Sequence, residues 1–240
     1  MTSKHISLVL SDGVELQPTS ATGVCRVKLI DETKRFDLTW DRFVRLHRAA
    51  REIKRLVPDS ETILDVGGFD GALAMFLPQY KVDVVDPATT SGTVFSVNQN
   101  SYEAVVSIDA IEHVEPKDRK AFLTHVTQVA KRSCFINFPS RQTTDSQALV
   151  LELTDNPLVK EHVEWPLPDA YEISRHLESQ GYSVDIQNHG SLTQWLSQSV
   201  LQTVSPEKAS RISRHLIENY LDEPSGAPLY HLVIGFKSSE

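Results

Sequence analysis

The chain has 240 residues, a formal net charge of −8 and a hydrophobic fraction of 40%. This size suits one α/β domain with added segments, and the excess of acid argues against a nucleic-acid partner, which requires a dense field of Lys and Arg. Cys25 and Cys134 lack disulfide or zinc spacing, and no apolar stretch reaches the length of a membrane span, so we expect a soluble protein of the reducing cytoplasm.

Residues 1–57 are expected to form an N-terminal extension followed by a cap helix. Short extended pieces are predicted at His5–Leu10, Val14–Leu16 and Val24–Ile30, because turn residues separate these runs. Thr39 is a suitable N-cap for a helix that continues to about Val57. Apolar residues recur there at helical spacing, which predicts one buried face.

The predicted cap helix also carries five arginines on its other side: Arg42, Arg45, Arg48, Arg51 and Arg55. We favour the interpretation that they form a solvated face, which offsets the acidic remainder of the chain. The alternative is that they bind an anionic group of a substrate or the carboxylate of a cofactor.

A glycine-rich turn between two short apolar runs is the most informative feature of the chain. The first run, Thr62–Val66, contains an acid near its end and leads through glycines into a short helix, Gly71–Leu77. The second run, Lys81–Asp86, also ends in an acid. Strand, tight turn, helix and strand is the layout of a nucleotide-binding βαβ unit, in which the second acid can bind ribose hydroxyls. The pattern therefore predicts an adenosine-containing cofactor.

The rest of the chain continues this alternation of strands and helices. The segment between Asp86 and Ala104 is short, so we expect one short strand near Thr93–Val97 and little helix. Strands are predicted at Ala104–Ile108, Cys134–Phe138, Tyr182–Ile186 and Tyr230–Phe236, and helices from Glu115 to Ala130 and over Ser146–Leu153, Asp169–Ser179, Ser191–Thr203 and Pro206–Leu221. Otherwise residues 140–166 are expected to be irregular. The last strand lacks a tightly packed crossover helix, which favours antiparallel pairing.

Four motifs in sequence order resemble the class I S-adenosylmethionine-dependent methyltransferases. They are Ile63–Gly71, Val84–Asp86, Tyr102–Val114 with its EHV loop after strand four, and Glu161–Trp165 followed by a capped helix. The EHV loop is similar to that of a bacterial subgroup acting on small molecules and glycans. The resemblance implies a doubly wound, mostly parallel, seven-stranded Rossmann-like sheet with an antiparallel last strand. The methyltransferase domain would span 58–240, with 191–228 as a helical lid insertion.

The resemblance also implies a set of cofactor contacts. Asp65 would meet the ammonium group of S-adenosylmethionine, and an acid near the end of a buried strand is costly without such a partner. Asp86 would bind both ribose hydroxyls, and Asn98 would lie near the adenine amino group. The implied cofactor-binding residues are Asp65, Gly67, Gly68, Phe69, Gly71, Asp86, Asn98 and Asp109. Phe69 departs from the family pattern because it occupies the place of the middle glycine.

His113 and His162 are the candidate catalytic residues, as bases or donors facing the transferred methyl group. A structural hydrogen bond is the alternative that we favour for each of them. Glu161 and Glu164 flank His162 and are expected to raise its basicity. No metal site is predicted, because the histidines are scattered and show no ligand spacing.

We therefore expect an enzyme that methylates a small molecule or a glycan-type or lipid-linked precursor, on oxygen, with S-adenosylhomocysteine as the second product. A place in glycan biosynthesis would suit this acceptor. The alternative is a catalytically inactive methyltransferase-like binding or scaffold domain, whose pocket Phe69 would block. An NAD-dependent oxidoreductase is disfavoured, because the turn reads GGFDG and the acid Asp65 precedes it. The sequence is compatible with a homodimer.

Overall fold

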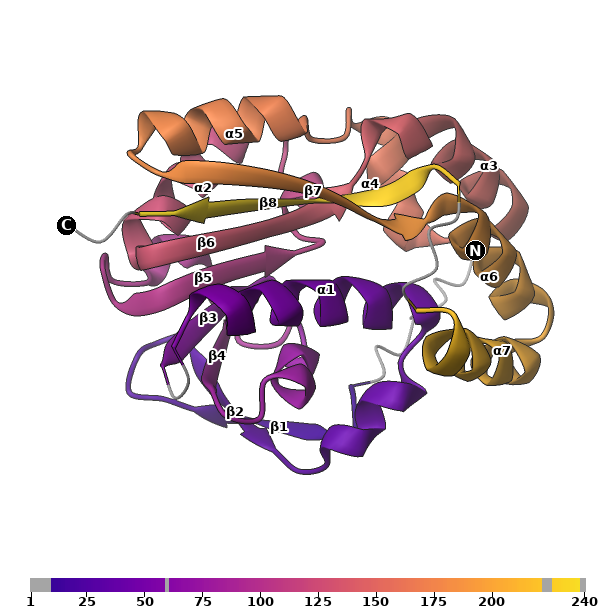
Figure 1. The fold of residues 1–240 in the computed structure, drawn as a ribbon, viewed down its shortest axis with the longest axis horizontal. Coiled ribbons are helices and arrows are strands. Elements are labelled where there is room, and N and C mark those ends of the chain that lie inside the picture. The colour runs from indigo at the N-terminus through magenta and orange to yellow at the C-terminus, as the bar shows by residue number, and fades with distance from the viewer. Residues whose placement is uncertain (1–9, 59–60, 222–225, 238–240) are drawn as a thin grey trace.

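The computed structural model describes residues 10–58, 61–221 and 226–237 and contains one mixed sheet (Figure 1). Its eight strands follow the order β1-β2-β4-β3-β5-β6-β8-β7, and β2 and β8 run against the other six. The strands are β1 (Val14–Pro18), β2 (Cys25–Leu29), β3 (Thr62–Val66), β4 (Lys81–Val85), β5 (Tyr102–Ile108), β6 (Ala130–Pro139), β7 (Ser183–Ser191) and β8 (Pro228–Phe236). The predicted antiparallel last strand is confirmed.

Two expectations about the sheet are wrong, and they share one cause. The sheet has eight strands where seven were expected, and the segment near Thr93–Val97 forms a short 3₁₀ turn, Val94–Ser96, in place of a strand. The N-terminal hairpin of β1 and β2 joins the sheet, and β2 pairs with β4 at Cys25 and Arg26. The hairpin therefore occupies the edge at which an added strand would pair. The predicted piece His5–Leu10 lies almost wholly outside the described residues.

Helices cover both faces of the sheet because its strands are apolar on both sides. On β3, Ile63 belongs to the core beneath α1 (Trp40–Leu56), whereas Leu64 belongs to the core beneath α2 (Arg119–Val129) and α5 (Ala170–Ser179). The predicted cap helix and the capped helix after Asp169 are confirmed. The helix expected at Gly71–Leu77 is instead a 3₁₀ helix, Ala72–Phe76.

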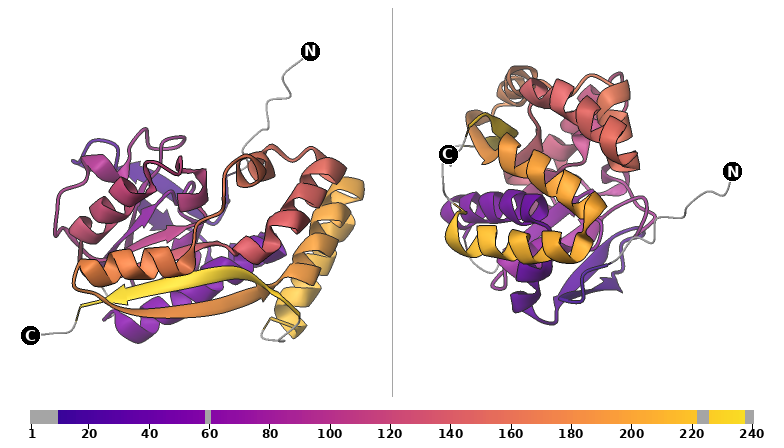
Figure 2. Two further views of the ribbon diagram at one scale, coloured as in Figure 1. Left: turned by 90° about the horizontal axis from the view of Figure 1, so that it is seen from above. Right: turned by 90° about the vertical axis from the view of Figure 1, so that its right-hand side faces the viewer.

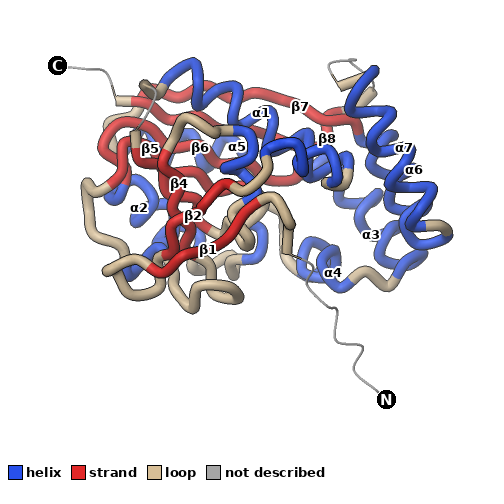
Figure 3. Tube along the Cα trace, turned by 90° about the horizontal axis from the view of Figure 1, so that it is seen from below, coloured by secondary structure: helices blue, strands red, loops and turns tan. Residues whose placement is uncertain are grey.

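The remaining helices gather beyond the carboxyl ends of the parallel strands (Figures 1 and 3). They are α3 (Thr144–Thr154), α4 (Pro157–Glu164), α6 (Leu192–Val204) and α7 (Pro206–Asn219). Figure 2 shows α6 and α7 beside each other at this end of the molecule. The sequence did not predict α4, a helix of only eight residues inside a stretch expected to be irregular. Within the described ranges, no helix combines the length and apolar composition that crossing a bilayer requires.

Candidate active site

A cavity of about 480 Å³ opens between the glycine-rich turn and the helices beyond the strand ends. Its walls come from α1, the turn after β3, the end of β5, and helices α3, α4 and α6. Open α/β sheets bind ligands at the carboxyl ends of their parallel strands, and this volume falls in the range of small-molecule pockets. The cavity is therefore the candidate site.

Asp65 stands at the cavity wall with an unsatisfied carboxylate. The residue is only 1% exposed, and its Oδ1 atom has no hydrogen-bond partner. Burial, reinforced by the nearby charge of Asp70, raises the pKa of Asp65 to about 7. A buried carboxylate in this condition favours a ligand that brings positive charge or hydrogen-bond donors.

The two glycines of the turn are required by its geometry. A Cβ atom on Gly68 would lie 2.4 Å from Cγ of Asp65, so the turn can pass over the carboxylate only without a side chain. Gly67 has a φ of +74°, and a Cβ atom there would lie 2.5 Å from Cβ of Ala110. The glycines therefore let the backbone lie directly beside Asp65.

Phe69 adopts a left-handed conformation in the same turn, with a φ of 51°. Its N–H donates to Oδ2 of Asp86 at 3.2 Å, and the Thr89 hydroxyl donates to its carbonyl at 2.6 Å. Left-handed backbone is unfavourable for a bulky residue, and these contacts offset the strain. Phe69 lines the cavity and leaves it open.

The structure brings seven of the predicted site residues to one cavity. They are Asp65, Gly67, Gly68, Phe69, Asp109, His113 and His162. The other three do not line it: Gly71 packs against Val27 of β2, Asn98 is exposed, and Asp86 lies behind the turn. Oδ1 of Asp86 accepts from the N–H groups of Ala88 and Thr89.

Two arginines of α1 reach the site. The Arg42 guanidinium donates to Oδ1 of Asp70 at 2.5 Å, and Arg45 lies 3.1 Å from Oδ2 of Asp109. Their side chains are only 24% and 17% exposed, and both line the cavity. The favoured interpretation of a solvated arginine face is therefore wrong for these two residues.

His113 and His162 meet at the far end of the cavity, with their Nε2 atoms 3.4 Å apart. His113 follows β5, whereas His162 comes from α4, so the fold alone creates this pair. Nδ1 of His113 lies 2.6 Å from Oε2 of Glu161, and Nδ1 of His162 lies 2.6 Å from Oε1 of Gln147. Both rings therefore have a fixed orientation.

The expected raised basicity of His162 is wrong. Burial, with the charges of His113 and Arg45 adding to it, lowers the pKa of His162 to about 3. Glu161, which was expected to act on His162, contacts His113. His162 is therefore held neutral.

Glu112 completes the cluster as a second unsatisfied carboxylate. It is 0% exposed, and neither carboxylate oxygen has a hydrogen-bond partner. Burial, with the charge of Asp109 adding to it, raises the pKa of Glu112 well above its usual value. Glu112 belongs to the EHV loop of the sequence, in which no pattern assigns it a role, and no motif marks Gln147.

Solved structures share this fold. The chain matches an S-adenosylmethionine-dependent methyltransferase from Archaeoglobus fulgidus at 16% identity and a TM-score of 0.51, covering 85% of this chain and 97% of that one. It matches a mycolic acid cyclopropane synthase complexed with S-adenosylhomocysteine at 16% identity and a TM-score of 0.50, covering 84% and 86%.

A longer enzyme also matches. For a Haemonchus contortus phosphoethanolamine N-methyltransferase the identity is 12% and the TM-score 0.46, and the match covers 87% of this chain but only 58% of that one. No model of a protein family matches the sequence, and no curated protein sequence does. The two matches with TM-scores of 0.51 and 0.50 show that the chain has the fold of these methyltransferases, and at 16% identity they show the fold alone.

Proposed function

We propose that this chain is an S-adenosylmethionine-dependent methyltransferase acting on a hydroxyl group of a small molecule. The observation that carries the proposal is Asp65, whose Oδ1 atom has no partner and which lines a cavity at the ligand-binding edge of a methyltransferase fold. A primary ammonium group supplies both the charge and the donors that this atom lacks. A nearly buried carboxylate with a spare acceptor therefore fits the methionine end of the cofactor.

The turn supports the same placement. The backbone of Gly67 and Gly68 would lie along the methionine part, because neither residue carries a side chain that would keep it away. Oδ2 of Asp86 accepts one hydrogen bond, from Phe69, and keeps a lone pair for a ribose hydroxyl. The exposed position of Asn98 lends its predicted adenine contact no support.

The far end of the cavity would hold the acceptor. Bound S-adenosylmethionine would supply an electrophilic methyl group on its sulfonium sulfur. The Nε2 atoms of His113 and His162 face the region where an acceptor hydroxyl must give up its proton as its oxygen attacks. We assign both histidines to this step, and we assign α6 to a lid, because Trp195 and Gln198 line the cavity from that helix.

Calorimetric titration of the full chain with S-adenosylhomocysteine tests the proposal. We expect one site per chain, and NADH under the same conditions should give no heat. Release of S-adenosylhomocysteine would then be screened against hydroxylated metabolites, sugars and lipid-linked precursors. Absence of heat and of any thermal shift at millimolar S-adenosylhomocysteine would overturn the proposal. Binding without turnover of any acceptor would favour the scaffold alternative.

A further inference from the structure

The cluster at the far end of the cavity has the composition of a metal site. Ligand atoms from Glu112, His113 and His162 all lie within 4.8 Å of one another. Two imidazoles and a carboxylate form a donor set that suits first-row divalent transition metals. The cluster escapes sequence analysis because Glu112 and His113 are adjacent in the chain whereas His162 comes from a different helix.

Hydrogen bonds behind His162 fix its tautomer. The Thr143 hydroxyl donates to the Ser140 carbonyl at 2.6 Å, so its oxygen accepts from Nε2 of Gln147 at 3.0 Å. This contact orients the Gln147 amide so that Oε1 faces His162 at 2.6 Å. An amide oxygen only accepts hydrogen bonds, so Nδ1 of His162 carries the proton and Nε2 carries the lone pair.

The second ring has the same arrangement. Nδ1 of His113 donates to the Glu161 carboxylate at 2.6 Å, so in the neutral ring the lone pair lies on Nε2. In that state two lone pairs face each other at 3.4 Å, and neither Nε2 atom has a proton to donate to the other. A carboxylate or carbonyl oxygen behind each metal-ligating histidine is the usual outer arrangement of metal sites.

Glu112 is the independent observation that points to a ligand. Its carboxylate is 0% exposed, has no hydrogen-bond partner, and lies 4.0 Å from Nε2 of His162. An uncompensated buried carboxylate is costly, and a bound cation removes the cost. Two ligands of a tetrahedral zinc ion lie about 3.3 Å apart, close to the separation of the two Nε2 atoms.

We propose that Glu112, His113 and His162 bind one divalent transition-metal ion, such as Zn²⁺ or Co²⁺, at the acceptor end of the cavity. Three protein ligands leave at least one coordination position open, and both histidines line the cavity through which an ion can enter. Binding of the ion does not depend on the proposed function. If that function holds, the open position would bind the acceptor oxygen, and the histidines would act through the ion.

The test is a titration of the untagged full chain with Co²⁺ after removal of metals by a chelator. We expect visible absorption bands of a low-symmetry Co²⁺ site, saturation at one ion per chain, and displacement by Zn²⁺. Glu112→Gln and His162→Ala should each weaken binding by at least about 100-fold, and Gln147→Ala by about 10-fold to 100-fold. His215→Ala, which removes an exposed histidine of α7, is the matched control and should bind like the wild type.

Thermal melting separates lost ligands from lost folding. The metal-free Glu112→Gln protein should melt no lower than the wild type, because the substitution removes a buried carboxyl group that has no hydrogen-bond partner. Zn²⁺ should raise the melting temperature of the wild type and of His215→Ala only. The proposal is overturned if the wild type shows only the spectrum of the hydrated ion, or if Glu112→Gln and His162→Ala bind Co²⁺ as tightly as His215→Ala.

Discussion

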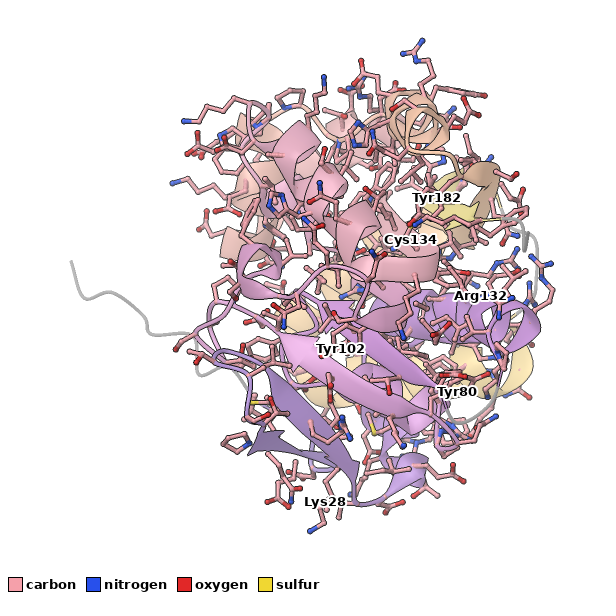
Figure 4. All side chains as sticks on the ribbon, turned by 90° about the vertical axis from the view of Figure 1, so that its left-hand side faces the viewer. Lys28, Tyr80, Tyr102, Arg132, Cys134 and Tyr182 are labelled. Atoms are coloured by element: carbon pink, nitrogen blue, oxygen red, sulfur yellow. The ribbon has the colours of Figure 1, made fainter. Side chains whose placement is uncertain are left out.

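Buried acids on the neighbouring strands β3 and β4 differ in how they are satisfied. Asp83 of β4, whose register partner on β3 is Leu64, accepts from Arg26 and from the Tyr102 hydroxyl at 3.0 Å. Figure 4 views the molecule from its left-hand side in Figure 1, with Tyr102 labelled beside the strands. Asp65 of β3 and Glu112, which follows β5, carry the only buried carboxylate oxygens without a partner among the described residues.

The difference separates structural acids from candidate ligand-binding acids. A fold that supplies Arg26 and Tyr102 for Asp83 shows how a buried carboxylate is satisfied within the protein. Asp65 lines the cavity, and Glu112 lies within 4.8 Å of the two histidines that line it, yet no described residue donates a hydrogen bond to either unpartnered acid. Because such carboxylates are costly, they mark where charge from outside the chain is expected to bind.

The largest effect on stability is expected from removing the Asp83 carboxylate, whose partners lie within the protein. Asp83→Leu should lower the free energy of unfolding by about 2 kcal/mol, because it leaves the Tyr102 hydroxyl buried without its partner. Arg26 is 42% exposed and can reach water, which limits the loss. Urea unfolding measures the change in the free energy of unfolding, and the affinity for S-adenosylhomocysteine should stay the same. The control is Glu103→Gln, which removes a more exposed ion pair with Lys131 and should change stability by less than about 0.5 kcal/mol.

A pH series sharpens the account of Asp65. Burial, together with the charges of Asp70 and Asp86, raises its pKa from 3.8 to about 7 in the folded protein, and Arg42 opposes this rise. The ammonium group of the ligand favours the ionised form of Asp65, so affinity for S-adenosylhomocysteine should rise about tenfold from pH 6 to pH 8. Calorimetry measures this affinity at each pH, and an affinity of the wild type that does not change with pH would contradict the assigned role of Asp65.

The raised pKa of Asp65 also determines the direction in which the stability of the protein changes with pH. Between pH 4 and pH 7 the folded protein holds a proton on Asp65 that the unfolded chain has lost, so this group lowers the stability as pH rises and the effect levels off above pH 7. In the absence of ligand at pH 8, Asp65→Asn should therefore raise the free energy of unfolding by about 1 kcal/mol. Urea titrations of the wild type and of Asp65→Asn at pH 5 and pH 8 measure the free energies of unfolding. A lower value for Asp65→Asn than for the wild type at pH 8 would contradict the raised pKa of Asp65.

The sequence predicted the parts of this protein that are local along the chain. The run from Thr62 to Val66, the turn glycines and the capped helix after Asp169 are encoded by short patterns, and they appear where expected. The hairpin at the sheet edge was missed because pairing of β2 with β4 depends on residues distant in sequence. The Glu112, His113 and His162 cluster was missed for the same reason, since α4 must fold against the end of β5 to form it.

The most direct test of the central claim compares three proteins in one experiment. S-adenosylhomocysteine is added to the wild type, Asp65→Asn and Asp83→Asn at pH 8, and the ligand-induced change in melting temperature is recorded. We predict clear stabilisation of the wild type and of Asp83→Asn, whatever their starting stabilities, and little or none of Asp65→Asn. Equal stabilisation of all three proteins, or of none, would contradict the claim that the unpartnered carboxylate of Asp65 marks the cofactor site.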